Sequence, residues 1–244
     1  MCGAGPGGGP AVAVISGANG SRLANFFAYE GSFRGGVGSV AMRDLDGDGL
    51  AELAVGAGDG GGPAIAIYSG GTFAETARFF AYDGGFRGGV NVALGEFEGL
   101  GPAIVAGAGV GGGPHVRLFA WGTFDSIRSY LVDVPAFRGG IAVAAGDFDN
   151  DGWDELATGR ASGGSAVSVT DPNTVSVLRS LPLRGGSPYG GVRVAAIPDG
   201  PGHDLLVGNA PGTALQLDRY SDVNADPITL LGPVPSRAYG IQVG

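Results

Sequence analysis

Residues Asp44–Pro63 read D-L-D-G-D-G-L-A-E-L-A-V-G-A-G-D-G-G-G-P, and the rest of the chain is interpreted outward from them. The stretch joins an acidic loop to a short apolar run and then to a glycine-rich turn. The glycine that ends the apolar run has counterparts at spacings of 53, 51, 52 and 49 residues, namely Gly3, Gly56, Gly107, Gly159 and Gly208. A pattern that recurs about every fifty residues is typical of a repeat architecture.

Each repeat predicts four short β-strands. Apolar runs rich in Val, Ile, Phe and Ala are bounded by Gly, Pro, Asp or Ser, which is a strand signature. In the best-preserved repeat the strands are expected at Ser39–Met42, Leu53–Val55, Ala64–Tyr68 and Arg78–Tyr82. Repeated four-stranded units of this kind form the blades of a β-propeller. We therefore predict an all-β fold, a five-bladed β-propeller with four-stranded antiparallel blades.

The two ends of the sequence are out of phase with the blades. The chain starts within a second strand, at Met1–Cys2, and it ends within an inner strand, at Ile241–Val243. These ends are expected to share one composite fifth blade with Ala11–Ile15, so that pairing of the N- and C-terminal strands closes the ring. Closure would remove the exposed sheet edges of an open propeller. Residues 1–244 are thus predicted to form a single domain.

Composition limits the classes of partner. Of the 244 residues 51 are glycine and 15% are charged, and the formal net charge is −9. An acidic surface argues against nucleic acids and anionic membranes as partners. No apolar run approaches the ~20 residues of a membrane span, so no membrane insertion is expected. The start of the sequence shows no signal-peptide pattern.

Two loops carry the pattern D-x-D-x-D-G-x-x-E, at Asp44–Glu52 and Asp147–Glu155. Alternating carboxylates, a backbone carbonyl at the seventh position and a carboxylate at the ninth supply the oxygen ligands that calcium prefers. We predict about two calcium ions per chain. The expected ligands are Asp44, Asp46, Asp48, the Leu50 carbonyl and Glu52 in the first loop, and Asp147, Asp149, Asp151, the Trp153 carbonyl and Glu155 in the third.

The alternative is a solvated acidic hairpin without a metal. Four carboxylates within nine residues repel one another unless a cation is present, which favours the metal. The loops that follow Glu96 and Asp199 lack most of the ligand positions, and no metal is assigned to them.

The acidic loop, the Phe-containing turn before the inner strand and the Gly-Ala-Gly segment after the second strand resemble FG-GAP repeats, also called VCBS-type repeats. Such repeats build the propeller of integrin α chains and occur in bacterial surface proteins. The resemblance implies a calcium-stabilised, extracellular or cell-surface propeller that binds or adheres to glycan or protein ligands. Two departures are that Glu52 and Glu155 stand where the family commonly has Asp, and that five blades are counted where integrins usually have seven.

A second candidate site lies in the segment Phe-Arg-Gly-Gly, which occurs three times. By strand parity, these segments share a face with the Gly-Gly-Gly-Pro turns, opposite the acidic loops. A ring of arginines and tyrosines there could bind acidic sugars or a carboxylate-bearing peptide. In the alternative, each arginine pairs with an acid of a neighbouring blade. The candidate ligand-binding residues are Arg34, Arg87, Arg138, Tyr29 and Tyr82.

Catalysis has little support in the sequence. His115 and His203 occur at unmatched positions, and no nucleophile motif or zinc spacing accompanies them. We therefore expect a monomeric, non-enzymatic binding or adhesion module. A purely structural scaffold without a ligand is the first alternative, and a glycan-cleaving enzyme is the second.

Overall fold

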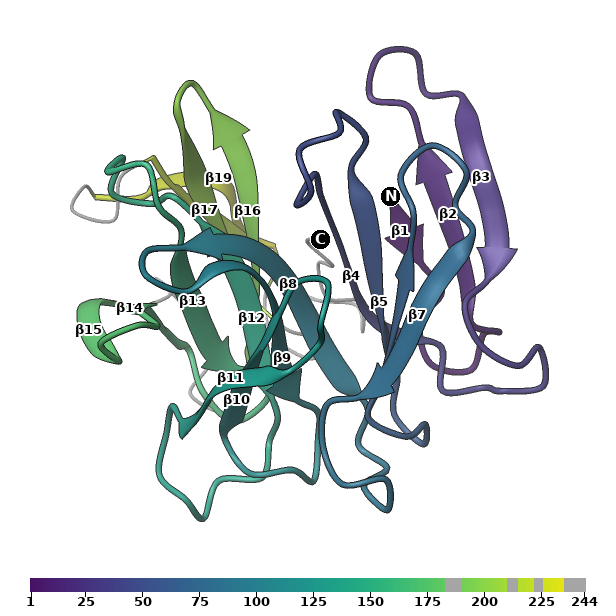
Figure 1. The fold of residues 1–244 in the computed structure, drawn as a ribbon. Helices are drawn as coiled ribbons and strands as arrows, with labels where there is room; N and C mark the ends of the chain where they lie inside the picture. The colour runs from purple at the N-terminus through teal and green to yellow at the C-terminus, as the bar shows by residue number, and fades with distance from the viewer. Residues whose placement is uncertain (183–189, 210–214, 222–225, 235–244) are drawn as a thin grey trace.

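The computed structural model describes residues 1–182, 190–209, 215–221 and 226–234. Within these ranges every regular secondary-structure element is a β-strand. They form five antiparallel sheets (Figure 1). The N-terminal blade has β1 (Cys2–Gly3), β2 (Ala11–Ile15) and β3 (Arg22–Phe27). Blade 1 has β4 (Val37–Arg43), β5 (Glu52–Ala57), β6 (Ala64–Tyr68) and β7 (Glu75–Phe80). Blade 2 has β8 (Val90–Phe97), β9 (Gly101–Ala108), β10 (His115–Ala120) and β11 (Ser126–Leu131). Blade 3 has β12 (Ile141–Gly146), β13 (Glu155–Arg160), β14 (Ala166–Asp171) and β15 (Ser176–Pro182). Blade 4 has β16 (Val192–Asp199), β17 (Gly202–Asn209), β18 (Leu215–Tyr220) and β19 (Ile228–Val234).

The blades are arranged around a central channel, and the predicted five-bladed propeller is confirmed. The inner strands β4, β8, β12 and β16, together with β1, line one cavity of about 260 Å³. The strand predicted at Met1–Cys2 lies one residue later, as β1 (Cys2–Gly3), in which Cys2 is paired with Ala13 of β2. The predicted closing strand Ile241–Val243 lies outside the described residues, so the N-terminal blade is described with three strands.

The hydrophobic core lies between blades rather than in one central mass. Four apolar clusters each join two consecutive blades. Between blades 1 and 2, for example, Ile65 and Ile67 of β6 pack with Val90 and Val92 of β8 and with Ile104 of β9. Each sheet therefore buries its faces against its neighbours, as expected for short apolar strands arranged in a ring.

The glycine that marks the repeat has a packing role. A side chain on Gly56 would clash with the carbonyl oxygen of Val90, where the inner strand of the next blade begins. A Cβ atom on Gly107 would likewise lie 2.6 Å from the carbonyl oxygen of Ile141. At Gly3, Gly56, Gly107 and Gly159 the strand lies so close to the next blade that an added Cβ atom would clash, which explains why glycine recurs at these positions.

The fourth strand of blade 1 begins earlier than predicted. The sequence predicts Arg78–Tyr82, whereas β7 is Glu75–Phe80. This outermost strand alternates between exposed and half-buried residues and starts with the exposed Glu75 and Thr76, which a search for apolar runs does not include. Ala81 and Tyr82 follow the strand and turn toward the next blade, where Ala81 is fully buried.

Candidate functional site

The first acidic loop joins β4 to β5 and is curled by its own carboxylates. Asp44 accepts hydrogen bonds from the backbone amides of Gly47 (2.8 Å) and Gly49 (2.9 Å). Carboxylate oxygens of Asp44, Asp46 and Asp48 lie within 4.8 Å of one another. Glu52 is not part of this group, and its carboxylate accepts a hydrogen bond from the amide of Leu45 at 3.0 Å. The structure thus gathers three of the four predicted carboxylate ligands of this loop.

The acidic loop of blade 3 joins β12 to β13 and repeats this arrangement. Asp147 accepts hydrogen bonds from the amides of Asp151 and Gly152, both at 3.1 Å. Here the oxygens that lie within 4.8 Å of one another belong to Asp147, Asp149 and Glu155. Asn150 takes a positive φ of 65°, where the first loop has Gly47 at 78°. Asparagine tolerates this conformation better than most residues, so both loops adopt the same curl.

Two of the loop carboxylates in blade 3 are buried close to other negative charges. Asp147 is 6% exposed and Glu155 is 5% exposed. Burial, with smaller contributions from the charges of Asp149, Asp151 and Asp147, raises the pKa of Glu155 to about 8. A carboxylate cluster with this much unbalanced charge suits a hard divalent cation, which would favour the ionised form. The donor set therefore fits calcium.

The loops of blades 2 and 4 have contracted. Between β8 and β9, pairing continues to Phe97 and Gly101, which leaves only a tight turn. Between β16 and β17, Asp199 pairs with Gly202 in a similar turn. Arg219 forms ion pairs with Asp199, at 3.0 Å, and with Asp204. In blade 4 an arginine thus balances acidic charge, and the candidate metal clusters within the described residues are those of blades 1 and 3.

Sequence reasoning missed two residues that connect the acidic loops, Arg43 and Asp154. Arg43 is the last residue of β4, and its guanidinium forms an ion pair with the Asp154 carboxylate at 2.5 Å. Each residue directly precedes a predicted ligand, Asp44 in one loop and Glu155 in the other. The adjacency of charged residues to the motifs is visible in the sequence, but their pairing depends on the ring.

The Phe-Arg-Gly-Gly segments lie at the opposite end of the blades, on what we call the turn face. Backbone amides of the glycine turns donate to the arginine carbonyls, as in the 2.8 Å bond from Gly60 to Arg87. The same bond joins Gly7 to Arg34 and Gly111 to Arg138. All three arginines are exposed. The predicted placement of these segments beside the glycine turns is therefore present in the structure.

The expected alternative, in which each arginine pairs with an acid of a neighbouring blade, is wrong for the described residues. The Arg34 Nη1 atom donates to the carbonyls of Gly31 (2.6 Å) and Phe33 (3.1 Å). Arg87 and Arg138 contact the carbonyls of their own segments in the same way. The guanidinium groups cap the loops that carry them, because those carbonyls are nearer than any described carboxylate.

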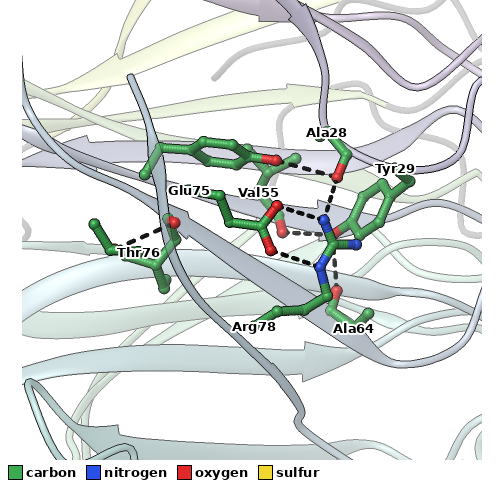
Figure 2. Close-up of polar contacts among 9 residues, drawn as sticks. Ala28, Tyr29, Val55, Ala64, Glu75, Thr76 and Arg78 are labelled. Atoms are coloured by element: carbon green, nitrogen blue, oxygen red, sulfur yellow. Dashed lines mark hydrogen bonds and ion pairs between the residues drawn. The ribbon is translucent and has the colours of Figure 1, made fainter. Parts of the chain in front are cut away.

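Tyr29 and Tyr82, which the sequence places in the ligand-binding ring, instead connect blades. The Tyr29 hydroxyl lies 2.7 Å from the carbonyl oxygen of Val55 and 3.0 Å from that of Ala64, both in blade 1 (Figure 2). Tyr82 contacts the carbonyls of Ala106 and His115 in blade 2, both at 2.8 Å. Burial raises the pKa of both tyrosines well above its ordinary value. Their polar atoms are occupied within the protein.

The next junction, between blades 2 and 3, has no tyrosine. Asp133 stands at the equivalent position, and its carboxylate pairs with the guanidinium of Arg160 in β13, at 2.5 and 2.7 Å. A cavity of about 370 Å³ lies beside this pair. Thr158 and Ala166, which correspond to the residues that accept the tyrosine hydroxyl elsewhere, are among its lining residues.

Comparisons with known proteins agree with this architecture. Among solved structures, the crystal structure of Saccharomyces cerevisiae Sqt1 is similar, with a TM-score of 0.52 and 11% identity. The similarity covers 90% of this chain and 55% of that one, so this chain spans about half its length, and at such identity the likeness concerns the fold alone. No curated protein sequence matches the chain. Residues 139–178, which include the acidic loop of blade 3, match the FG-GAP repeat family, so the five-bladed propeller contains an FG-GAP repeat.

Proposed function

We propose that this protein is a calcium-stabilised binding or adhesion propeller of the extracellular or cell-surface type, without enzymatic activity. The observation that carries the proposal is the separation of two features. Two acidic loops occupy one face of the ring, and three exposed arginines at repeated positions occupy the other. One face supplies a site for structural cations, and the other supplies a charged surface for a partner.

Calcium is assigned to the loops of blades 1 and 3. Asp44, Asp46 and Asp48, with the Leu50 carbonyl and Glu52, would hold one ion. Asp147, Asp149 and Asp151, with the Trp153 carbonyl and Glu155, would hold the other. A bound divalent cation would offset the repulsion among these carboxylates. Support comes from the gathered oxygen atoms, from the burial of Asp147 and Glu155, and from the hydrogen bonds that already hold both loops in one curl.

The ligand is an anionic glycan or a carboxylate-bearing peptide that meets Arg34, Arg87 and Arg138. The Nη1 atom of each arginine donates to carbonyl oxygens of its own loop. The Nε and Nη2 atoms carry further donors that a ligand could meet. Three similar exposed sites would each bind weakly, and affinity would come from multivalency. The net charge of −9 disfavours nucleic acids, and the structure contains no helix, in the ranges it describes, long and apolar enough to cross a membrane.

The proposal that the protein has no enzymatic activity rests on the residues that line the central channel. Glycoside hydrolysis needs a pair of carboxylates about the scissile bond. None of the described residues that line the channel is Asp or Glu. Residues at equivalent positions on four inner strands are Ser39, Asn91, Ala142 and Arg193. A monomeric binding module agrees with this lining better than a hydrolase does.

A glycan and peptide array, probed with and without calcium, tests the proposed function. We expect binding to anionic ligands that is lost in the triple variant R34A/R87A/R138A, while calcium uptake persists. The single variant R22A, which removes an exposed arginine from strand β3, is the control and should bind as the wild type does. An array with no positive ligand would favour the scaffold alternative.

A further inference from the structure

The central channel contains one charged side chain among its described lining residues. The cavity of about 260 Å³ is formed mostly by small or apolar residues of the inner strands. Arg193, near the start of β16, is the exception. A guanidinium placed in such surroundings loses hydration, and it needs either a counter-charge or a full set of hydrogen bonds in compensation.

The described residues supply the Arg193 guanidinium with only some of the hydrogen bonds that it can donate. The Arg193 Nη1 atom donates to the carbonyl oxygens of Val192 at 3.0 Å and of Ala161 at 3.2 Å. No carboxylate in the described part of the chain pairs with it, and burial lowers its pKa. The Nε and Nη2 atoms have no acceptor among the described residues. A half-buried cation, with donors that no described residue accepts, thus lines a cavity in a protein whose net charge is −9.

The two preceding inner strands line the same cavity as Arg193. Ala142 of β12 and Asn91 of β8 occupy positions equivalent to Arg193 on the two preceding inner strands. Asn91, Ala142 and Arg193 all line the same cavity, and the alanine contributes only a methyl group to it. Asn91 is held in place by donating from Nδ2 to the carbonyl of Ile141 at 2.7 Å, which leaves its other amide proton for a ligand.

We propose that Arg193 is the centre of an anion-binding site in the channel, and that the site takes a small carboxylate. A planar carboxylate can accept two parallel hydrogen bonds from a guanidinium, and the bond is strengthened where water is excluded. The acidic protein disfavours larger polyanions. The carboxylate comes either from a free small acid or from the C-terminus of a short peptide. The proposal does not depend on the turn-face arginines or on calcium.

Isothermal titration with sodium acetate tests the site, at constant ionic strength set with a bulky sulfonate buffer salt. An acetylated dipeptide with a free C-terminus and its amide form distinguish the two sources. We expect saturable binding of acetate or of the free-acid dipeptide, and no binding of the amide. R193Q should weaken binding by about tenfold or more, and R193K should bind with intermediate affinity because it keeps the charge without the fork. The exposed control R22Q, on strand β3, should bind as the wild type does.

The site would be refuted by a wild type that shows no saturable binding, or by equal binding to folded R193Q. Tighter binding of phosphate than of acetate would refute the carboxylate assignment. If R193Q does not fold, R193K and the wild-type titration still decide the question. A third outcome would also contradict the proposal, namely a wild type that binds no anion together with an R193K variant that is less stable. This result would mean that groups of the protein itself compensate the charge of Arg193.

Discussion

The Arg43 guanidinium and the Asp154 carboxylate connect the two acidic loops across blade 2. Their Nη1–Oδ2 distance is 2.5 Å, and the Asp154 side chain is only 1% exposed. The same Asp154 oxygen accepts a hydrogen bond from the backbone amide of Glu96 at 2.6 Å. One buried carboxylate therefore joins the inner strand of blade 1, the end of β8 in blade 2 and the loop of blade 3.

We expect the substitution D154N to destabilise the fold by about 3 kcal/mol, because it leaves Arg43 partly buried without its counter-charge. Calcium affinity should fall in both loops, because Arg43 directly precedes the ligand Asp44 and Asp154 directly precedes the ligand Glu155. Chemical denaturation measures the free energy of unfolding. The control is E75Q, which breaks the Glu75–Arg78 pair, in which both side chains are 38% exposed, and should cost under about 1 kcal/mol. Equal losses in the two variants would contradict the linking role of Asp154.

Local features of the fold were predictable from the sequence, whereas contacts across the ring were not. The repeat of Gly56, the apolar runs and the curled loops depend on residues close in sequence, so their patterns are visible in it. Arg43 and Asp154 meet only because the blades are assembled, and nothing in the spacing of charges indicates which pairs form. Tyr29 was misplaced for the same reason, because an aromatic residue near a loop can face solvent or the next blade.

The pH dependence of stability provides a second prediction, for the calcium-free protein. The pKa of Glu155 is raised to about 8 from an ordinary value of 4.5, so the folded state binds a proton that the unfolded state releases in this interval. The contribution of Glu155 is therefore fully present below about pH 4.5 and is lost as the pH rises through about 8. Thermal unfolding in chelator should show stability that declines with pH.

The variant E155Q isolates this effect. Glutamine cannot titrate, so the decline between about pH 5 and pH 8 should become shallower in E155Q. Saturating calcium should flatten the same interval in the wild type, because the cation favours the ionised carboxylate. Identical pH profiles for E155Q and the wild type in chelator would show that Glu155 does not bind the proton.

The junction between blades 2 and 3 allows a test of the tyrosine link. The double substitution D133Y/R160A copies the sequence of the preceding junction, where Tyr82 and Ala108 stand at the equivalent positions. The introduced ring should occupy the cavity of about 370 Å³ and donate to the carbonyls of Thr158 or Ala166. Each single variant loses the ion pair, and D133Y alone also crowds Arg160. We expect the double variant to be more stable than the sum of the singles by about 1–3 kcal/mol.

Urea denaturation of the four proteins in this cycle gives the coupling energy. The corresponding substitution Y82F tests the native link, and removal of its hydroxyl should cost about 1–2 kcal/mol, because two buried carbonyls lose a donor. Additive effects in the cycle would mean that the junctions are not interchangeable and that the tyrosines are not general blade connectors.

Calcium titration of the metal-stripped protein is the most direct test of the central claim, that the two acidic loops are cation sites that stabilise the ring. Isothermal calorimetry should show about two ions per wild-type chain, one in D46N/D48N and one in D149N/D151N, with a melting temperature that rises with calcium as mass action requires. The control D83N, on the turn face, should still bind two. No detectable uptake at about millimolar calcium, or unchanged stoichiometry in both loop variants, would contradict the account.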